Sequence, residues 1–340
     1  MMGGVIQLHD IDPILFRLGP LQVHWYGLMY GIGFLVAWLI GSRRVRAGRL
    51  PGVDEDGFAS FMIAMIAGVL LGGRIGYVLF YSFDTFAADP LSIIKIWEGG
   101  MSFHGGLIGV LIAAWVWKRK RTEFTYWDLV DFVAPLVPAG LGLGRLGNFI
   151  NGELWGKYTG GDWGVIFPSD PELSGYTMAQ LRQMYAAGQL DAFARHPSQL
   201  YQAFLEGLVL FTVLYVVSRR PRRRFLISGL FALGYGLARF AVEFVRVPDA
   251  QLGYLGMGWL TMGQLLSLPL ILLGIGLIIL SRTSPVLEPK PVEPEGEGED
   301  KTEDEDEDPD EDDSKDDAED EDSEDAAVDS EADEPDSTRG

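Results

Sequence analysis

Residues 208–230 read LVLFTVLYVVSRRPRRRFLISGL, in which two apolar runs flank a group of five arginines. Extended to 199–217 and 225–245, each run reaches about 20 residues, which is the length that a helix needs to cross a bilayer. The arginines between the runs fall where two consecutive membrane helices would be joined on one side of the membrane. The stretch therefore predicts a polytopic membrane protein.

Further apolar stretches lie on both sides of this one. Seven in all are long enough or nearly so: 22–41, 58–81, 103–117, 129–150, 199–217, 225–245 and 260–281. The third is short and the fourth contains Pro135 and Pro138, so either can be bent or partly re-entrant. We expect an all-α bundle of seven transmembrane helices.

Lysine and arginine clusters set the orientation of this bundle. They follow the first, third, fifth and seventh spans, at 43–49, 118–121, 219–224 and 282. With seven spans all four clusters share one side, which the positive-inside rule makes cytoplasmic. The N-terminus is then outside and the C-terminus cytoplasmic. The long segment 151–198, between the fourth and fifth spans, forms a small extracytoplasmic cap.

The charge divides the chain into two domains. Residues 1–287 carry 19 acidic and 23 basic side chains, whereas residues 288–340 carry 29 acidic and 4 basic ones. The second segment has too few large apolar residues to offset the entropy of ordering, so we expect a disordered, acidic cytoplasmic tail. The first 20 residues lack a basic segment followed by an apolar core, so no cleavable signal peptide is expected.

The chain has no cysteine, which excludes disulfides, thiolate metal sites and a cysteine nucleophile. Its four histidines lie far apart in sequence, at positions 9, 24, 104 and 196. We therefore expect neither a metal site nor a cofactor.

Three arginines lie near the predicted outer ends of the second, fourth and sixth spans: Arg74, Arg145 and Arg239. A lone arginine in such a place often extends to lipid headgroups. Three at similar depth, flanked by glycines, instead favour a phosphate site, because a guanidinium binds phosphate through two parallel hydrogen bonds and keeps its charge in a low dielectric. Ionisable residues inside spans are usually functional.

Other polar residues gather on the same side. His104 opens the third span beside glycines, Asn148 and Glu153 follow Arg145, and Tyr26 begins the first span. Tyr235, Arg239 and Glu243 recur at four-residue spacing on one face of the sixth span. A channel would need polar groups through the full depth of the membrane, so the pattern favours an interfacial enzyme.

The stretch GRLGNFINGELWG, at 144–156, closely resembles the signature of the prolipoprotein diacylglyceryl transferase family. WYG at 25–27, HGGLIG at 104–109, HPSQLY at 196–201 and the stretch 239–253 agree with it, and the resemblance covers about residues 5–283. Val247 is one departure, since glutamate is expected there.

The resemblance implies an enzyme of the bacterial cytoplasmic membrane whose active site faces the extracytoplasmic side. It moves the diacylglyceryl group of phosphatidylglycerol to the lipobox cysteine thiol of a preprolipoprotein signal peptide, and glycerol phosphate leaves. Membrane lipids are further partners, and nucleic acid is not. The positions that match the residues of the family's site are Tyr26, His104, Arg145, Asn148, Glu153, Gly156, Arg239 and Glu243.

This reaction needs a thiolate, and His104 is our first choice for the base because its ordinary pKa lies near neutrality. Glu243 and Glu153 are the rivals. Arg145 and Arg239 are expected to stabilise the charge on the leaving phosphate. Arg74 either assists them or holds a structural partner. The expected phosphatidylglycerol-binding set is Tyr26, Arg74, Arg145, Asn148, Glu153, Gly156, Tyr235 and Arg239.

Three other classes of protein stay open at this point. A lipid or solute transporter would show a continuous polar path or an inverted repeat, and neither is visible. A scaffold would use the acidic tail to recruit a basic partner. A phospholipid hydrolase would share the arginines but would release glycerol phosphate without a thiol acceptor.

Overall fold

The computed structural model describes residues 5–19, 21–95, 99–248, 253–256 and 258–291. Residues Met1–Pro294 form one compact unit. The predicted tail lies outside the described residues from position 292 onward, as do residues 249–252 of the stretch that resembles the family. The start of the predicted tail, 288–291, is described and belongs to this unit: the Lys290 amide donates to the Gly48 carbonyl at 3.0 Å.

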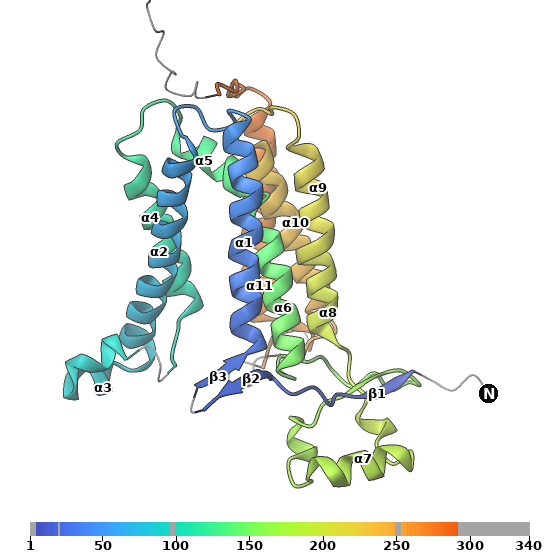
Figure 1. Ribbon diagram of the computed structural model, residues 1–340. Helices are drawn as coiled ribbons and strands as arrows, with labels where there is room; N and C mark the ends of the chain where they lie inside the picture. The colour runs from blue at the N-terminus through green and yellow to red at the C-terminus, as the bar shows by residue number, and fades with distance from the viewer. Residues whose placement is uncertain (1–4, 20, 96–98, 249–252, 257, 292–340) are drawn as a thin grey trace, which may run out of the picture. The chain divides into compact units, whose positions relative to one another are not determined.

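The helices of the bundle form most of the unit (Figure 1). They are α1 (Trp25–Arg46), α2 (Glu55–Tyr81), α4 (Phe103–Lys118), α5 (Tyr126–Val133), α6 (Val137–Ile150), α8 (Ser198–Gln202), η5 (Ala203–Val209), α9 (Leu210–Val217), α10 (Leu226–Val242) and α11 (Met262–Ser281). Short helices connect them: α3 (Phe83–Ala88), η1 (Pro90–Ile94), η3 (Pro171–Leu173), α7 (Met178–Ala186) and η4 (Asp191–Phe193).

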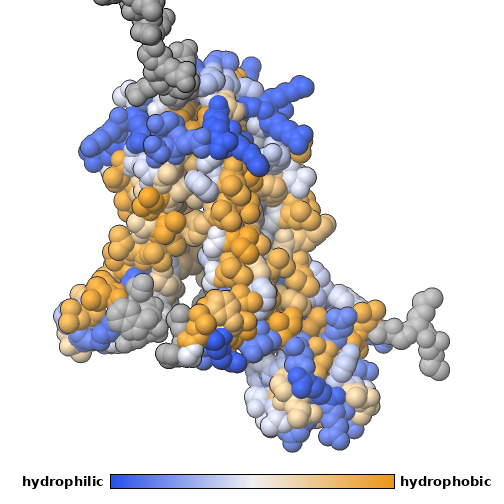
Figure 2. All heavy atoms as spheres, in the orientation of Figure 1, coloured by the Kyte–Doolittle hydropathy of each residue, from blue (hydrophilic) through white to orange (hydrophobic). Residues whose placement is uncertain are grey.

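The helices make this a multi-pass membrane protein. Among the described residues, α1, α2, the run from α8 to α9 and α11 are long and apolar enough to cross a bilayer. The α5–α6 pair is a fifth candidate, bent by 47°, whereas α4 and α10 have 16 and 17 residues. Figure 2 shows a hydrophobic band over the helices between two hydrophilic zones.

The bend in the predicted fourth span is confirmed. It falls between Val133 and Val137, and Pro138 stands in the first turn of α6. Proline lacks an amide hydrogen and disfavours helical backbone in the residue before it, so one helix ends here and another begins.

The all-α expectation was incomplete, because the described residues of this mostly helical unit also form three two-stranded sheets. β1 (Ile6–Leu8) pairs in parallel with β4 (Gly164–Ile166), and β2 (Ile14–Leu18) pairs antiparallel with β3 (Leu21–His24). β5 (Tyr254–Gly256) pairs antiparallel with β6 (Leu260–Thr261). Each strand has two to five residues, which is too short to leave a clear alternating pattern.

Glycines bring α2 and α4 into close contact. A Cβ atom added at Gly109 would lie 2.9 Å from the Gly72 Cα, and one added at Gly72 would lie 2.4 Å from the Gly105 carbonyl oxygen. Side chains at these positions would force the two backbones apart. Close approach through small residues is the usual way in which membrane helices pack, and it joins α4, with His104 at its start, to α2.

The predicted cap, 151–198, has an apolar core of Ile166, Leu173, Leu181 and Leu190. Beside it the Arg195 Nε donates to Asp170 at 2.6 Å, and both side chains are less than a tenth exposed. Burial opposes ionisation of Asp170. Hydrogen bonds from Arg195 and from the Glu172 amide outweigh burial and hold the pKa of this carboxyl below its ordinary value of 3.8.

We predict that Asp170→Asn destabilises the cap by about 3–5 kcal/mol, because it leaves Arg195 buried without its counter-ion. Hydrogen exchange of residues 164–195 measures this change. Since the pKa of Asp170 is lowered, its contribution is present at neutral pH and is lost as the pH falls through that lowered value. Asp10→Asn is the control, because Asp10 pairs with Arg182 on an exposed surface. Equal exchange in the two variants would contradict the role of the buried pair.

Candidate functional site

A network of arginines and glutamates lies between α6, η5 and α10. The Arg145 Nε on α6 is 3.5 Å from a carboxylate oxygen of Glu206 on η5. Arg239, near the end of α10, pairs with Glu243 at 2.9 Å, and Arg246 approaches the same carboxylate at 3.5 Å. Glu206 interacts electrostatically with both Arg145 and Arg239. The network therefore joins Arg145 to Arg239, which are far apart in sequence.

The two carboxylates of this network are buried and its arginines are partly open. The side chains of Glu206 and Glu243 are 0% and 2% exposed, whereas those of Arg145 and Arg239 are 22% and 17% exposed. The contact of 3.5 Å between Arg145 and Glu206 is longer than an ordinary N–H···O hydrogen bond. Arg145, with five donors, thus keeps the capacity to bind an anion.

Helix geometry places each member of the network. Arg239 and Glu243 lie four residues apart at the end of α10, so they share one face. Tyr235, one turn earlier, has Glu206, Arg145 and Arg239 as its electrostatic neighbours. Glu206 lies in a π-helical segment, a departure from the α-helix that often marks functional sites. Gln202 donates to its other carboxylate oxygen at 3.0 Å.

A second group surrounds Glu153, just beyond the end of α6. Its carboxylate accepts from the side-chain amides of Asn148, at 2.9 Å, and Asn151, at 3.2 Å. Tyr26 interacts with Asn148 and Glu153. Gly147 lies against the Tyr26 ring, where an added Cβ would come within 2.8 Å. The structure thus brings Tyr26, Asn148 and Glu153 together at the end of α6 that carries Arg145.

The backbone after Glu153 is strained. Leu154 has φ of +56°, which a leucine rarely adopts. Its carbonyl accepts from the Ser198 hydroxyl at 2.9 Å, and the Gln199 side chain donates to the Glu153 carbonyl at 2.6 Å. Side chains at the start of α8 therefore fix the turn that carries Glu153.

Gly156 is needed for close backbone contact. An added Cβ would lie 2.6 Å from the Val245 carbonyl oxygen and 2.7 Å from that of His196. Gly156 also forms a β-bridge with Arg246. The predicted binding residue Gly156 thus joins the cap to the segment that carries Glu243 and Arg246.

The structure places Arg74 apart from this network. On α2 its guanidinium donates to the carbonyls of Ile93, at 3.0 Å, and Gly100, at 3.2 Å. It also donates to the carbonyls of Ser92 and Gly99. Backbone carbonyls in the segment after α3 thus engage its donors, which favours the structural partner over the phosphate role.

His104 is also apart from the network. It is exposed in the first turn of α4 and lies edge-on to Phe103. In the described part of the chain, no hydrogen bond or ion pair links it to Arg145, Arg239 or Glu243. Nor does any group of three or more histidine, aspartate or glutamate side chains lie close enough to hold a metal ion among those described residues.

Glu206 and Arg246 were not among the site residues predicted from the sequence. The available signal for Glu206 was a carboxylate within an apolar run, which usually has a function or a partner. Its partner was not predictable, because the π-helical turn changes which face of the helix Glu206 occupies.

The model of the prolipoprotein diacylglyceryl transferase family matches residues 13–280. The chain belongs to this family. A phosphatidylglycerol–prolipoprotein diacylglyceryl transferase of Xanthomonas campestris pv. campestris (strain B100) is 64% identical over 285 residues, which cover 84% of this chain and 96% of the relative. The protein of the same name from Xanthomonas euvesicatoria pv. vesicatoria (strain 85-10) is 62% identical over 292 residues, covering 86% and 98%. This chain is therefore a membrane transferase of lipoprotein biosynthesis.

We predict that Glu206→Gln lowers both thermal stability and transferase activity. The change keeps the shape of the side chain but removes the negative charge between Arg145 and Arg239, and breaking a buried pair costs about 3–5 kcal/mol. Thermal unfolding in detergent measures the first effect. Glu55→Gln is the control, because Glu55 forms an exposed ion pair with Arg46. A Glu206→Gln variant as stable and active as this control would contradict the central place of Glu206.

Proposed function

We propose that this chain transfers the diacylglyceryl group of phosphatidylglycerol to the lipobox cysteine thiol of a prolipoprotein signal peptide, at the site between Arg145 and Arg239. The observation that supports this location of the active site is the buried Glu206, which interacts electrostatically with both arginines. Their partly exposed guanidiniums supply the positive charge that a phosphodiester needs.

The topology belongs to the same proposal. Seven spans are obtained when α4 and α10 cross the membrane beside the five candidate spans. All four basic clusters then lie at one end, which we assign to the cytoplasm of a bacterium, with the protein in its inner membrane. The Arg145–Arg239 site and the cap then face the extracytoplasmic side, where a signal peptide emerges. The charge change after residue 287 marks the boundary between transferase domain and tail.

In the reaction the cysteine sulfur attacks the saturated glyceryl carbon that carries the phosphate. A carbon–sulfur bond forms, the carbon–oxygen bond to phosphate breaks, and glycerol phosphate leaves with the bonding electrons. Negative charge then grows on the phosphate oxygens. Arg145 and Arg239 stabilise that charge, and Glu206 and Glu243 hold the two guanidiniums in place before the reaction begins.

Tyr26, Asn148, Glu153 and Tyr235 hold the rest of the headgroup in this proposal. Glu153 accepts hydrogen bonds from Asn148 and Asn151 in the present structure. The glycerol hydroxyls of phosphatidylglycerol are donors that can replace those amides. Gly156 shapes the floor of the site, and Arg74 acts indirectly by holding the segment after α3.

The proton of the thiol goes to His104 in our preferred scheme. Glu243 is engaged by two arginines and Glu153 by two asparagine amides, so both carboxylates already have other partners in the structure. His104 has neither kind of partner among the described residues. His104 lies on α4, which packs on α2, whereas Arg239 lies on α10. The scheme therefore requires the bound lipid and peptide to extend from α4 to α10.

The transfer itself is tested with purified protein, phosphatidylglycerol and a lipobox peptide, by following the peptide mass and free glycerol phosphate together. We predict one added diacylglyceryl mass for each glycerol phosphate released. Release without the peptide would instead indicate a hydrolase. A folded protein that gives neither product would leave lipid transport as the better explanation.

The variant Arg145→Lys, measured in the same assay, tests whether Arg145 belongs to the site that binds the lipid phosphate. Lysine keeps the charge but loses the two-pronged hydrogen bonding, so turnover should fall by about a hundredfold or more. Arg119→Lys is the matched control, because Arg119 stacks on Trp115 at the far end of α4. Near-normal turnover in Arg145→Lys would remove Arg145 from the phosphate site.

His104→Gln tests the base. Turnover at neutral pH should be lost while phosphatidylglycerol binding, measured by equilibrium binding of a labelled lipid, is kept. Residual activity that rises steadily with pH would assign the proton to solvent or to another group. Loss of lipid binding would instead make His104 a headgroup ligand.

A further inference from the structure

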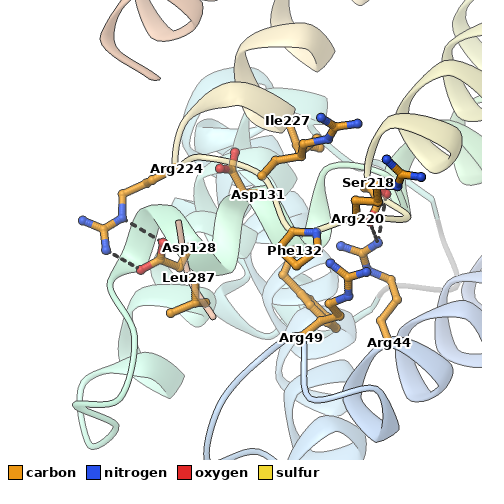
Figure 3. Close-up of a pocket in the computed structure, with 12 residues that line it drawn as sticks. Arg44, Arg49, Asp128, Asp131, Phe132, Ser218, Arg220, Arg224, Ile227 and Leu287 are labelled. Atoms are coloured by element: carbon orange, nitrogen blue, oxygen red, sulfur yellow. Dashed lines mark hydrogen bonds and ion pairs between the residues drawn. The ribbon is translucent and has the colours of Figure 1, made fainter. Parts of the chain in front are cut away.

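Two adjoining cavities lie where α1 and α9 end and α10 begins. They have volumes of about 50 Å³ and 170 Å³, and Arg44, Arg49 and Ser218 line both. Figure 3 shows the smaller one, with side chains that come from α1, α5 and the α9–α10 connection. A single water needs only about 10–15 Å³, so the larger cavity has room for a polar group of several atoms.

The larger cavity is strongly positive. Arg43, Arg44, Arg49 and Arg219 line it, and no acidic residue is among the described residues that do. Asp128 and Asp131 line the smaller cavity, and Asp131 interacts electrostatically with Arg44. Asp128 accepts two hydrogen bonds from Arg224, at 2.8 and 2.9 Å, and Asp131 accepts from the Ser228 amide at 2.7 Å. The positive charge of the larger cavity is thus not neutralised by its own lining.

Arg44 is held in place with a donor to spare. Its guanidinium donates to the Ser218 hydroxyl at 2.9 Å and lies over the Phe132 ring, 5.2 Å from the centroid. Its Nε is buried and has no hydrogen-bond partner among the described residues. A buried donor without an acceptor is costly, and a bound anion or water commonly completes such a site.

The cavity also has an apolar side. Ile40 and Tyr215 line it together with the arginines, and both residues lie near the ends of candidate membrane spans. Free phosphate makes no use of an apolar wall. A phospholipid places a phosphate at the level of the arginines and an acyl chain beside such a wall, and basic pockets between membrane helices bind anionic headgroups in this way.

We propose that the cavity lined by Arg43, Arg44, Arg49 and Arg219 binds the headgroup phosphate of an anionic phospholipid from the leaflet at that end. This site is separate from the one between Arg145 and Arg239. It binds lipid without reacting with it, since neither a histidine nor an unpaired carboxylate lines the cavity among the described residues.

The test is native mass spectrometry of the full chain in detergent, titrated with phosphatidic acid. Wild type should bind one lipid that Arg145→Gln does not remove. Arg43→Gln should weaken the binding of this lipid about fivefold, and the double variant Arg43→Gln with Arg44→Gln should weaken it about 25-fold. Each arginine near a membrane surface contributes roughly 1 kcal/mol to the binding of an anionic lipid. Arg43 is exposed, so the single variant removes its charge without disturbing buried packing.

Lys120→Gln is the matched control, because it removes one charge from another exposed residue in a basic cluster. Equal weakening by Lys120→Gln and Arg43→Gln would overturn the proposal in favour of general attraction. Inorganic phosphate is the second probe and should not displace the lipid. Displacement at phosphate concentrations comparable with the lipid would assign the cavity to free phosphate.

Discussion

Charges inside an apolar bundle need counter-charges. The proposed site depends on the ion pair between Glu206 and Arg145, with Arg239 as a further electrostatic neighbour of Glu206. A guanidinium alone at this depth would be costly, and a carboxylate alone would take up a proton. Their pairing offsets part of the cost of burying each charge and fixes the position of one relative to the other. Arg145 comes from the bent α5–α6 pair and Arg239 from α10, so the same interaction ties two parts of the fold together.

Close backbone contacts support this network from outside. Gly142 on α6 lies against Gly207 on η5, where an added Cβ would come within 2.9 Å of the neighbouring Cα. This approach places Glu206, the residue before Gly207, next to α6. On the cap side, Gly156 allows the strand-like bridge to Arg246. Glycine thus serves two purposes here: it packs helices, and it brings charged side chains from different segments into reach of one another.

The sequence predicted the helical segments well, because their apolar length and the basic clusters follow directly from the physics of the bilayer. The bend before α6 was predictable from Pro135 and Pro138. The partners of each arginine were not, since they depend on which turn of one helix faces another. Arg74 and Arg145 stand in similar glycine-flanked patterns, yet Arg74 engages backbone carbonyls and Arg145 a glutamate. The apolar runs and the prolines are strong local signals in the sequence. Neither the short strands nor the π-helical turn that carries Glu206 left a signal as strong as these.

The central claim is that Arg145 and Arg239 hold the phosphate of the lipid substrate. The most direct measurement is a structure of the protein with an unreactive phosphatidylglycerol analogue, in which the phosphorus position is located. We predict that its phosphate lies within hydrogen-bonding distance of both guanidiniums, with Glu206 still between them. A phosphate bound beside Arg74 or at the start of α4, without contact to Arg145 and Arg239, would contradict the account.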